Sequence, residues 1–225
     1  MRGLVDQLII GKVATDDDFG ASVAFRNIGN PPKKKIKKSV PFSNIVHDFS
    51  KINGQLYWEE RTLEYVFEIT ANTPEELEEK KQLFVSWIMN VMGEELHDPF
   101  IFGYHFIATY DDIDIDDSEV EKTTITVKFT AYPYMIANTK KVYNIELEAE
   151  AEGTIVIVND SSHRITPTLI ADVPFTVTNG DTTFAIPSGT ITDASFMFAV
   201  GANTVTVKAG EKAGTLKIEF FEEVL

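Results

Sequence analysis

Hydrophobic and polar residues alternate along several short stretches of the chain, and this period of two predicts β-strands. In the clearest run, residues 61–70, the apolar side chains on one face are Leu63, Tyr65, Phe67 and Ile69. Similar runs cover residues 22–28, 100–110 and 121–130, and in the first of them Val23, Phe25 and Asn27 are expected on one face. The pattern therefore predicts a mainly β protein.

One stretch has the period of a helix instead. Thr73 suits an N-cap, Pro74 suits the first helical position, and Glu76 completes a capping box. The apolar stripe consists of Leu77, Phe84, Trp87, Ile88 and Val91. Gly93 is expected to end the helix. Since the helix is rich in glutamate, it is predicted to lie on a sheet rather than on a membrane surface.

The composition changes after residues 138–141, and residues 144–225 contain no Tyr and no Trp. We expect an α+β domain at residues 1–140, a β-sandwich or split barrel with one packed helix, and a galectin-like β-sandwich at residues 141–225. In the second domain, Asn179-Gly180 predicts a hairpin with a type I′ turn. A second hairpin is expected to join residues 204–208 and 215–221 across Gly210 and Gly214.

Composition excludes several kinds of chemistry. Cysteine is absent, so disulfides, thiolate metal sites and cysteine nucleophiles are excluded. The formal net charge of −15 repels nucleic-acid phosphates, so sequence-specific nucleic-acid binding is not expected. No apolar run is long enough to span a bilayer, and the first residues lack the apolar core of a signal peptide.

Two groups of residues resemble metal sites, but neither has the spacing that such a site requires. Residues 112–116 alternate Asp with Ile, but an EF-hand loop needs Gly and Glu where Asp117 and Thr123 stand. A strand edge guarded by charged residues is the preferred interpretation, with adventitious calcium binding left open. His97, Asp98 and His105 fit no compact zinc pattern, and a turn after the helix is preferred for the first two.

Catalytic motifs are missing as well. The sequence contains no Gly-x-Ser-x-Gly, no P-loop and no His-Glu-x-x-His. The acidic composition leaves paired-carboxylate hydrolysis open, yet no pair stands out. We therefore expect no catalytic, cofactor-binding or metal-binding residues, no cofactor, and no enzymatic activity.

An ordered series of short motifs carries more information than any one of them. The series runs through a lysine-rich segment, Val40-Pro41-Phe42, Asp48-Phe49-Ser50, Asn53-Gly54, Tyr57, Glu60-Arg61-Thr62-Leu63, the helix capped at Thr73-Pro74, Phe129 and Tyr132-Pro133-Tyr134. This series resembles the N-terminal domain of the distal tail protein (Dit) family of long-tailed bacteriophages. Residues 159–167 are similar to the start of that family's galectin-like C-terminal sandwich.

The resemblance implies a structural protein of a phage or prophage. It implies a homo-hexameric ring at the virion tail tip, assembled in the bacterial host cytoplasm. The implied partners are the major tail (tube) protein on one side and the tail-tip hub or tail-associated lysin on the other, with no membrane. The second domain is too short for the long arm with which some relatives grip receptor-binding proteins.

Charge and apolar patterns suggest where copies of the chain meet. The lysine run is either a solvated loop or the basic half of a head-to-tail charge pairing, with residues 111–117 as the acidic half. The candidate interface residues are Lys33, Lys34, Lys35, Lys37, Lys38, Phe42, Ile45, Phe49, Asp112, Asp114 and Asp116.

A carbohydrate-binding module used in host adsorption is the alternative function. Sugar sites usually stack a ring on Trp or Tyr, and residues 144–225 contain neither. The Phe residues of the second domain follow strand patterns that predict core positions, apart from one of the adjacent pair Phe220 and Phe221. His163 and Arg164 are the polar candidates there, and a turn at a strand edge is preferred for both.

Overall fold

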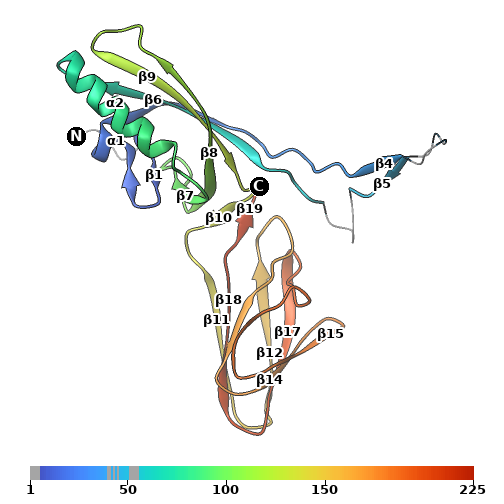
Figure 1. Ribbon diagram of the computed structural model, residues 1–225. Helices are drawn as coiled ribbons and strands as arrows, with labels where there is room; N and C mark the ends of the chain where they lie inside the picture. The colour runs from blue at the N-terminus through green and yellow to red at the C-terminus, as the bar shows by residue number, and fades with distance from the viewer. Residues whose placement is uncertain (1–5, 40–41, 43, 45, 51–55) are drawn as a thin grey trace. The chain divides into compact units, whose positions relative to one another are not determined.

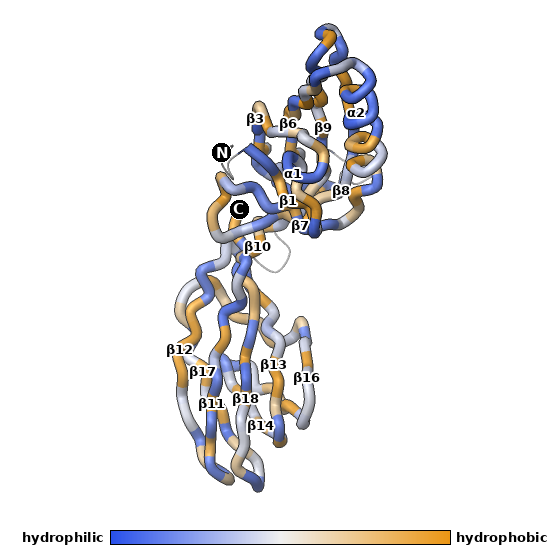
Figure 2. Tube along the Cα trace, turned by 90° about the vertical axis from the view of Figure 1, so that its left-hand side faces the viewer, coloured by the Kyte–Doolittle hydropathy of each residue, from blue (hydrophilic) through white to orange (hydrophobic). Residues whose placement is uncertain are grey.

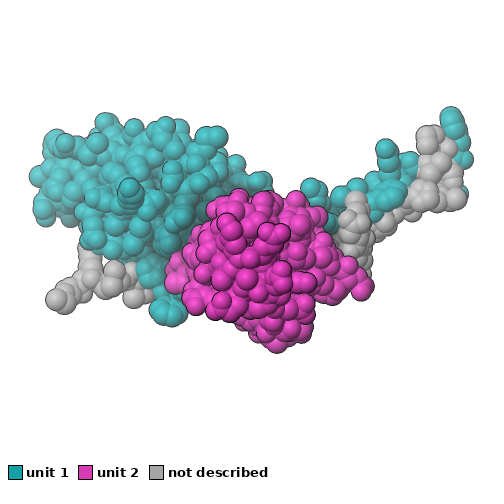
Figure 3. Space-filling view, turned by 90° about the horizontal axis from the view of Figure 1, so that it is seen from below, with its two compact units in different colours: residues 1–135, 225 teal, residues 136–224 magenta. Residues whose placement is uncertain are grey.

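The structure, a computed structural model, describes residues 6–39, 42, 44, 46–50 and 56–225 (Figure 1). The chain forms two compact units, one of residues 1–135 with Leu225 and one of residues 136–224 (Figure 3). Strands dominate both units, which confirms the predicted mainly β class. No described helix has the length and apolar character that a membrane crossing would need.

The first unit is built on one antiparallel sheet. Its strands, in the order in which they lie side by side, are β2 (Val13–Ala14), β1 (Ile9–Ile10), β7 (Glu94–His97), β8 (Tyr104–Asp116), β9 (Lys122–Ala131), β6 (Arg61–Thr70) and β3 (Ala21–Ile28). The central pair β6 and β9 stays in register over ten residues, from Arg61–Ala131 to Thr70–Lys122.

Helix α2 (Pro74–Ile88) covers one face of this sheet (Figure 1). The Thr73 hydroxyl accepts the backbone N–H of Glu76 at 3.2 Å, as predicted, whereas the Glu76 carboxylate accepts from Asn72 at 3.3 Å. The helix ends at Ile88, earlier than predicted. Gly93, with φ of 67°, instead makes the left-handed bend that leads into β7.

A short helix that the sequence analysis did not predict, α1 (Thr15–Phe19), completes this layer. The Phe19 ring lies 5.8 Å from the ring of Phe84 and 4.9 Å from that of Trp87, centre to centre. Beneath the helices, the core includes the fully buried Leu63, Tyr65, Phe67, Ile69, Phe84, Ile88, Ile125, Val127 and Phe129. The other face of the sheet remains polar, as is common for antiparallel sheets.

A β-bulge corrects the prediction for β3. The register against β6 shifts between Val23 and Phe25. Val23 therefore faces the core and is 6% exposed, while Phe25 faces outward and is 53% exposed. The two residues do not share a face, because the extra residue of a bulge reverses the alternation.

The second unit is a sandwich of two four-stranded sheets (Figure 2). One sheet has the order β11 (Lys141–Leu147), β18 (Gly214–Phe220), β13 (Thr168–Ala171) and β16 (Gly189–Thr192). The other has the order β12 (Glu152–Asn159), β17 (Gly201–Ala209), β14 (Phe175–Asn179) and β15 (Thr182–Ile186). Strands β10 (Met135–Ala137) and β19 (Glu223–Val224) pair outside these sheets. Phe175, Phe196, Phe198 and Phe220 lie in the core as expected.

Both predicted turns of the sandwich need correction. Asn179 pairs with Thr182, so the two turn residues are Gly180 and Asp181, and only Gly180 has a positive φ. This is the pattern of a type II′ turn, not of type I′. Strands β17 and β18 exist but lie in different sheets, so they form no hairpin. The chain crosses between the sheets at residues 210–213, and a Cβ atom at Gly214, where β18 begins, would overlap Val173.

Candidate subunit interface

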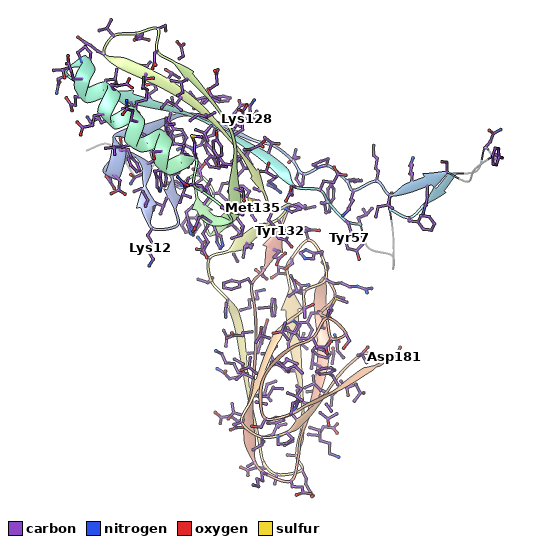
Figure 4. The ribbon with its side chains drawn as sticks, viewed as in Figure 1. Lys12, Tyr57, Lys128, Tyr132, Met135 and Asp181 are labelled. Carbon is purple, nitrogen blue, oxygen red and sulfur yellow. The ribbon has the colours of Figure 1, made fainter. Side chains whose placement is uncertain are left out.

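The lysine run lies in a two-stranded arm that continues β3 and β6 beyond the sheet (Figure 1). Gly29 N–H donates to the Thr62 carbonyl at 3.0 Å, Glu59 to Pro32 at 2.8 Å and Lys34 to Tyr57 at 2.9 Å. Further out, β4 (Lys37–Ser39) pairs with β5 (Val46–Asp48), with Lys37 opposite Asp48. Tyr57 stands on the returning strand of this arm (Figure 4).

All five candidate lysines of the arm are exposed: Lys33, Lys34, Lys35, Lys37 and Lys38. The Lys33 ammonium lies 5.7 Å from the centre of the Trp58 ring, within range of a cation–π contact. The arm therefore presents a row of positive charges on a paired backbone rather than on an irregular loop.

Two of the apolar candidates are exposed on this arm. Phe42 is fully exposed and has a φ of 63°, a conformation uncommon for a residue other than glycine. Phe49 is 45% exposed, and its N–H donates to the carbonyl of Ile36 at 2.8 Å. Ile45 lies outside the described residues.

The acidic candidates belong to a strand, as the alternation with isoleucine suggested. Asp112, Asp114 and Asp116 are exposed on the outer half of β8, opposite Lys128, Thr126 and Thr124 of β9. Lys128 Nζ comes within 3.8 Å of the Asp112 carboxylate. At the hairpin tip, hydrogen bonds from Lys81 at 2.8 Å and from the Thr123 hydroxyl at 2.5 Å lower the pKa of Asp117.

The strand register places the acidic segment along β8, with Asp112 three residues and Asp116 seven residues from the end of the sheet where the arm leaves. The arm leaves from the end where Arg61 pairs with Ala131, and the acidic hairpin closes beyond the end where Thr70 pairs with Lys122. Ten residues of strand, about 33 Å, separate these ends. The structure therefore does not bring the predicted basic and acidic residues together within one chain.

A buried polar cluster surrounds Asp98. The sequence analysis predicted no metal site among these residues. The Asp98 side chain is completely buried, and Arg26 Nε donates to its oxygens at 3.1 and 3.2 Å. Burial and the nearby Asp98 carboxylate raise the pKa of the Tyr65 phenol. The rings of His97 and His105 lie with their centres 4.9 Å apart and their planes tilted by 35°. No group of side chains in the described ranges could hold a metal ion. The turn predicted at His97 and Asp98 does not directly follow the helix: His97 ends β7, and Asp98 comes after that strand.

Asp98 also fixes a loop of exposed aromatic residues that the sequence analysis assigned to a strand. Phe100 is 63% exposed and Phe102 is 96% exposed. The N–H of Phe100 donates to the Asp98 carboxylate at 3.0 Å, and the N–H of Ile101 donates to the Asp98 carbonyl at 2.8 Å. Pro99 and Gly103 were the signals that the strand begins only at Tyr104.

At the base of the arm, Arg61 is 3% exposed and its guanidinium lies 5.3 Å from the centre of the Phe106 ring. Neither Nε nor Nη2 has a hydrogen-bond partner among the residues that the structure describes, and burial lowers the pKa of Arg61. The residue was noted in the sequence only as part of a motif.

The described residues also form two concave sites. The first unit has a pocket of about 210 Å³ between the β1–β2 hairpin and the end of α2, lined by Ile10, Gly11, Lys12, Val13, Trp87, Asn90, Val91 and Glu94. The second unit has an open groove of about 580 Å³ across β14, β15 and β17, lined by Thr176, Ala185, Lys208 and neighbours. His163 lies apart from that groove, 3.3 Å from Glu223.

Comparison with known proteins then places this architecture. No family model and no curated protein matches the sequence. Among solved structures, the Dit protein of phage SPP1, called a paradigm of hub adsorption apparatus in Gram-positive-infecting phages, has a TM-score of 0.71 at 10% identity. This match covers 98% of the present chain and 100% of the other.

Two baseplate structures of phage P2 in the activated conformation are more distant. One, with calcium, has a TM-score of 0.37 at 11% identity and covers 86% of this chain and 90% of its own. The other, with strontium, has a TM-score of 0.39 at 12% identity and covers 96% and 98%. The match to SPP1 Dit confirms the predicted resemblance at the level of the fold: this chain has the fold of a phage Dit hub protein.

Proposed function

We propose that the chain is a distal tail protein of a phage or prophage. In this proposal, six copies form a ring at the virion tail tip that joins the tail tube protein to the tail-tip hub or tail-associated lysin. The role is structural, without catalysis or cofactor. The observation that carries the proposal is the end-to-end correspondence with SPP1 Dit, which includes both units.

The distribution of charge supports assembly from head to tail. The lysine arm leaves one end of the sheet, and the acidic part of β8 runs from Asp112, three residues in from that end, toward the hairpin at the other end. A surface that pairs with a different surface of the next copy generates a ring when the rotation closes. We propose that the arm of each copy lies against the acidic hairpin of its neighbour, which also reduces the repulsion between chains of charge −15.

The negative net charge of the chain also suggests how DNA passes through the ring. In the proposed ring the channel wall is acidic, so that DNA passes without adhering to it. A ring whose lumen is basic would contradict this part of the proposal.

The carbohydrate-binding alternative gains no support from the groove on the sandwich. Phe175 lines the groove but is only 3% exposed, so it offers no ring face for stacking. The remaining side chains that line it are small or aliphatic, apart from Lys208. A glycan array that gives strong binding would overturn this assessment.

The test is negative-stain microscopy of the purified chain, with light-scattering mass on the same sample. The expected particles are six-fold rings with an open pore and six times the chain mass. If only monomers appear, co-expression with the neighbouring tail proteins follows. Monomers there as well would contradict the ring and favour the carbohydrate-binding alternative.

A further inference from the structure

Arg61, where the arm meets the sheet, is a buried cation that pairs with no carboxylate of the described residues. It is the first residue of β6, and the alternation of the strand turns its side chain to the core face that carries Leu63 and Tyr65. Two of its nitrogens, Nε and Nη2, have no hydrogen-bond partner in the described part of the chain. The guanidinium instead meets the Phe106 ring, whose centre lies 5.3 Å from the guanidinium carbon.

This burial costs free energy that the contacts of Arg61 do not return. Arginine stays protonated in proteins, and a charge taken out of water regains its hydration energy only from an anion and from hydrogen bonds. The Phe106 ring returns a part of the loss. Arg26 shows the usual arrangement in the same unit, with its Nε 3.1 Å from the Asp98 carboxylate. Any local opening that hydrates Arg61 therefore recovers free energy.

The chain beside Arg61 lacks backbone donors where the arm leaves the sheet. Pro31 and Pro32 have no N–H to donate to the returning strand, and neither β3 nor β6 extends over them. The Glu59 N–H still donates to the Pro32 carbonyl at 2.8 Å. The ladder between the two strands is therefore weaker here than inside the sheet.

The strand register puts this segment next to the buried cation. The register is constant from Ile28–Leu63 to Lys33–Trp58, so Asn30 lies opposite Arg61. Asn30 is exposed and uncharged, and it supplies no anion. The unpaired guanidinium and the donor-poor part of the arm therefore coincide.

Proteins open locally where few bonds hold the chain. We propose that residues 29–34 and 57–61, here called the arm base, form a hinge that Arg61 holds close to opening. In the closed form, which the structure has, the guanidinium is buried without an anion. In the open form the pair Arg61–Ala131 separates, water hydrates the guanidinium, and the arm changes direction while the rest of the β6–β9 ladder stays closed. The hinge belongs to the single chain, so it goes beyond the proposed ring and does not depend on it.

Hydrogen exchange of the backbone amides, followed by mass spectrometry on the full-length chain, measures the opening. Arg61→Met keeps a long side chain and removes the charge, so the closed form no longer carries the cost of burying it. We expect exchange at the arm base to slow at least tenfold, while exchange in β12 and β17 of the second unit stays unchanged. Arg61→Lys keeps a cation and is expected to retain fast exchange. If Arg61→Lys slows exchange as much as Arg61→Met, charge is not the cause and the proposal is overturned.

A second variant leaves Arg61 in place. Asn30→Asp puts a carboxylate opposite Arg61, and we expect it to slow exchange at the arm base severalfold. Lys128→Met removes an exposed cation elsewhere on the sheet and is expected to leave the arm base unchanged. Wild-type exchange in both Arg61→Met and Asn30→Asp, or equal slowing by Lys128→Met, overturns the hinge. If Arg61→Met does not fold, Asn30→Asp alone decides.

Discussion

Arg26 and Asp98 are 72 residues apart in the sequence, yet Arg26 Nε lies 3.1 Å from the Asp98 carboxylate under the sheet. Arg26 belongs to the edge strand β3, and Asp98 begins the turn between β7 and β8. The pair therefore ties this turn to a strand that lies four places away from β7 in the sheet. The Asp98 carboxylate also accepts the backbone N–H of Phe100 at 3.0 Å.

We expect Arg26→Ala to destabilise the first unit strongly. The Asp98 side chain is completely buried, so removal of Arg26 leaves a carboxylate in the interior without its cation. Such losses cost about 3–5 kcal/mol. Urea unfolding followed by tryptophan fluorescence measures the change, because Trp87 packs against this core.

The matched control is Lys128→Ala. Lys128 forms an exposed ion pair with Asp112 at 3.8 Å, and exposed pairs contribute at most about 1 kcal/mol. If Arg26→Ala and Lys128→Ala cost the same, the buried pair does not have the structural role described here.

Charge reversal on the arm tests the proposed pairing between copies. The triple change Lys34→Glu, Lys35→Glu and Lys37→Glu is expected to abolish ring formation, measured by light scattering and negative stain. Adding Asp112→Lys, Asp114→Lys and Asp116→Lys to the same chain restores complementarity and is expected to restore the ring. Intact rings with the first set alone would contradict the pairing.

The cap of α2 has a measurable energy. Thr73→Ala removes the acceptor of the Glu76 N–H and is expected to lower the free energy of unfolding by about 1 kcal/mol. Thr73→Ser keeps the hydroxyl and is expected to retain most of the stability. Equal losses in both variants would mean that the hydroxyl is not what stabilises this end of the helix.

Gly214 is predicted to be intolerant of a side chain. A Cβ atom there would overlap Val173 Cγ2 and lie 2.5 Å from Asp172 Oδ1, and such crowding costs about 1–3 kcal/mol. Gly153→Ala is the comparison, since its Cβ would meet only the end of the Leu147 side chain, at 3.1 Å. Thermal unfolding of the two variants should differ by several degrees; equal melting temperatures would contradict the crowding.

Acid is expected to destabilise the second unit through Glu219. Hydrogen bonds from Lys140 and Lys217, both at 2.7 Å, hold the pKa of Glu219 below its ordinary value of 4.5. The stabilisation is therefore complete above pH 4.5 and is lost as the pH falls through the lowered pKa. Glu219→Gln should flatten the melting temperature between pH 5 and pH 3; an unchanged slope would exclude this carboxylate as the cause.

Local signals in the sequence correctly predicted the structural features that depend on neighbouring residues. The alternation in residues 61–70, the cap at Thr73 and the fold resemblance agree with the structure. The errors arose where one residue or one distant partner decides the outcome. A bulge near Phe25 turned that side chain outward, and no pattern in residues 22–28 marks it.

Long-range pairing explains the other differences. Gly210 and Gly214 have the spacing of a hairpin, but their flanking strands pair with β14 and β13 in separate sheets. The sequence pattern did not reveal the exposed loop at residues 98–103, because Phe100 and Phe102 alternate with other residues as in a strand. Its exposure depends on the turn at Asp98, and thus on Arg26, which the local sequence does not indicate.

The constant register between the base of the arm and the sheet has a mechanical consequence. From Phe25–Val66 to Lys33–Trp58, facing residues keep one constant register, so the base of the arm and strands β3 and β6 form a single ribbon. A pull along this ribbon does not peel its strands apart one bond at a time. It loads all the hydrogen bonds between β6 and β9 together, in shear, over ten residue pairs. The arm therefore acts as a tether whose strength is that of the sheet.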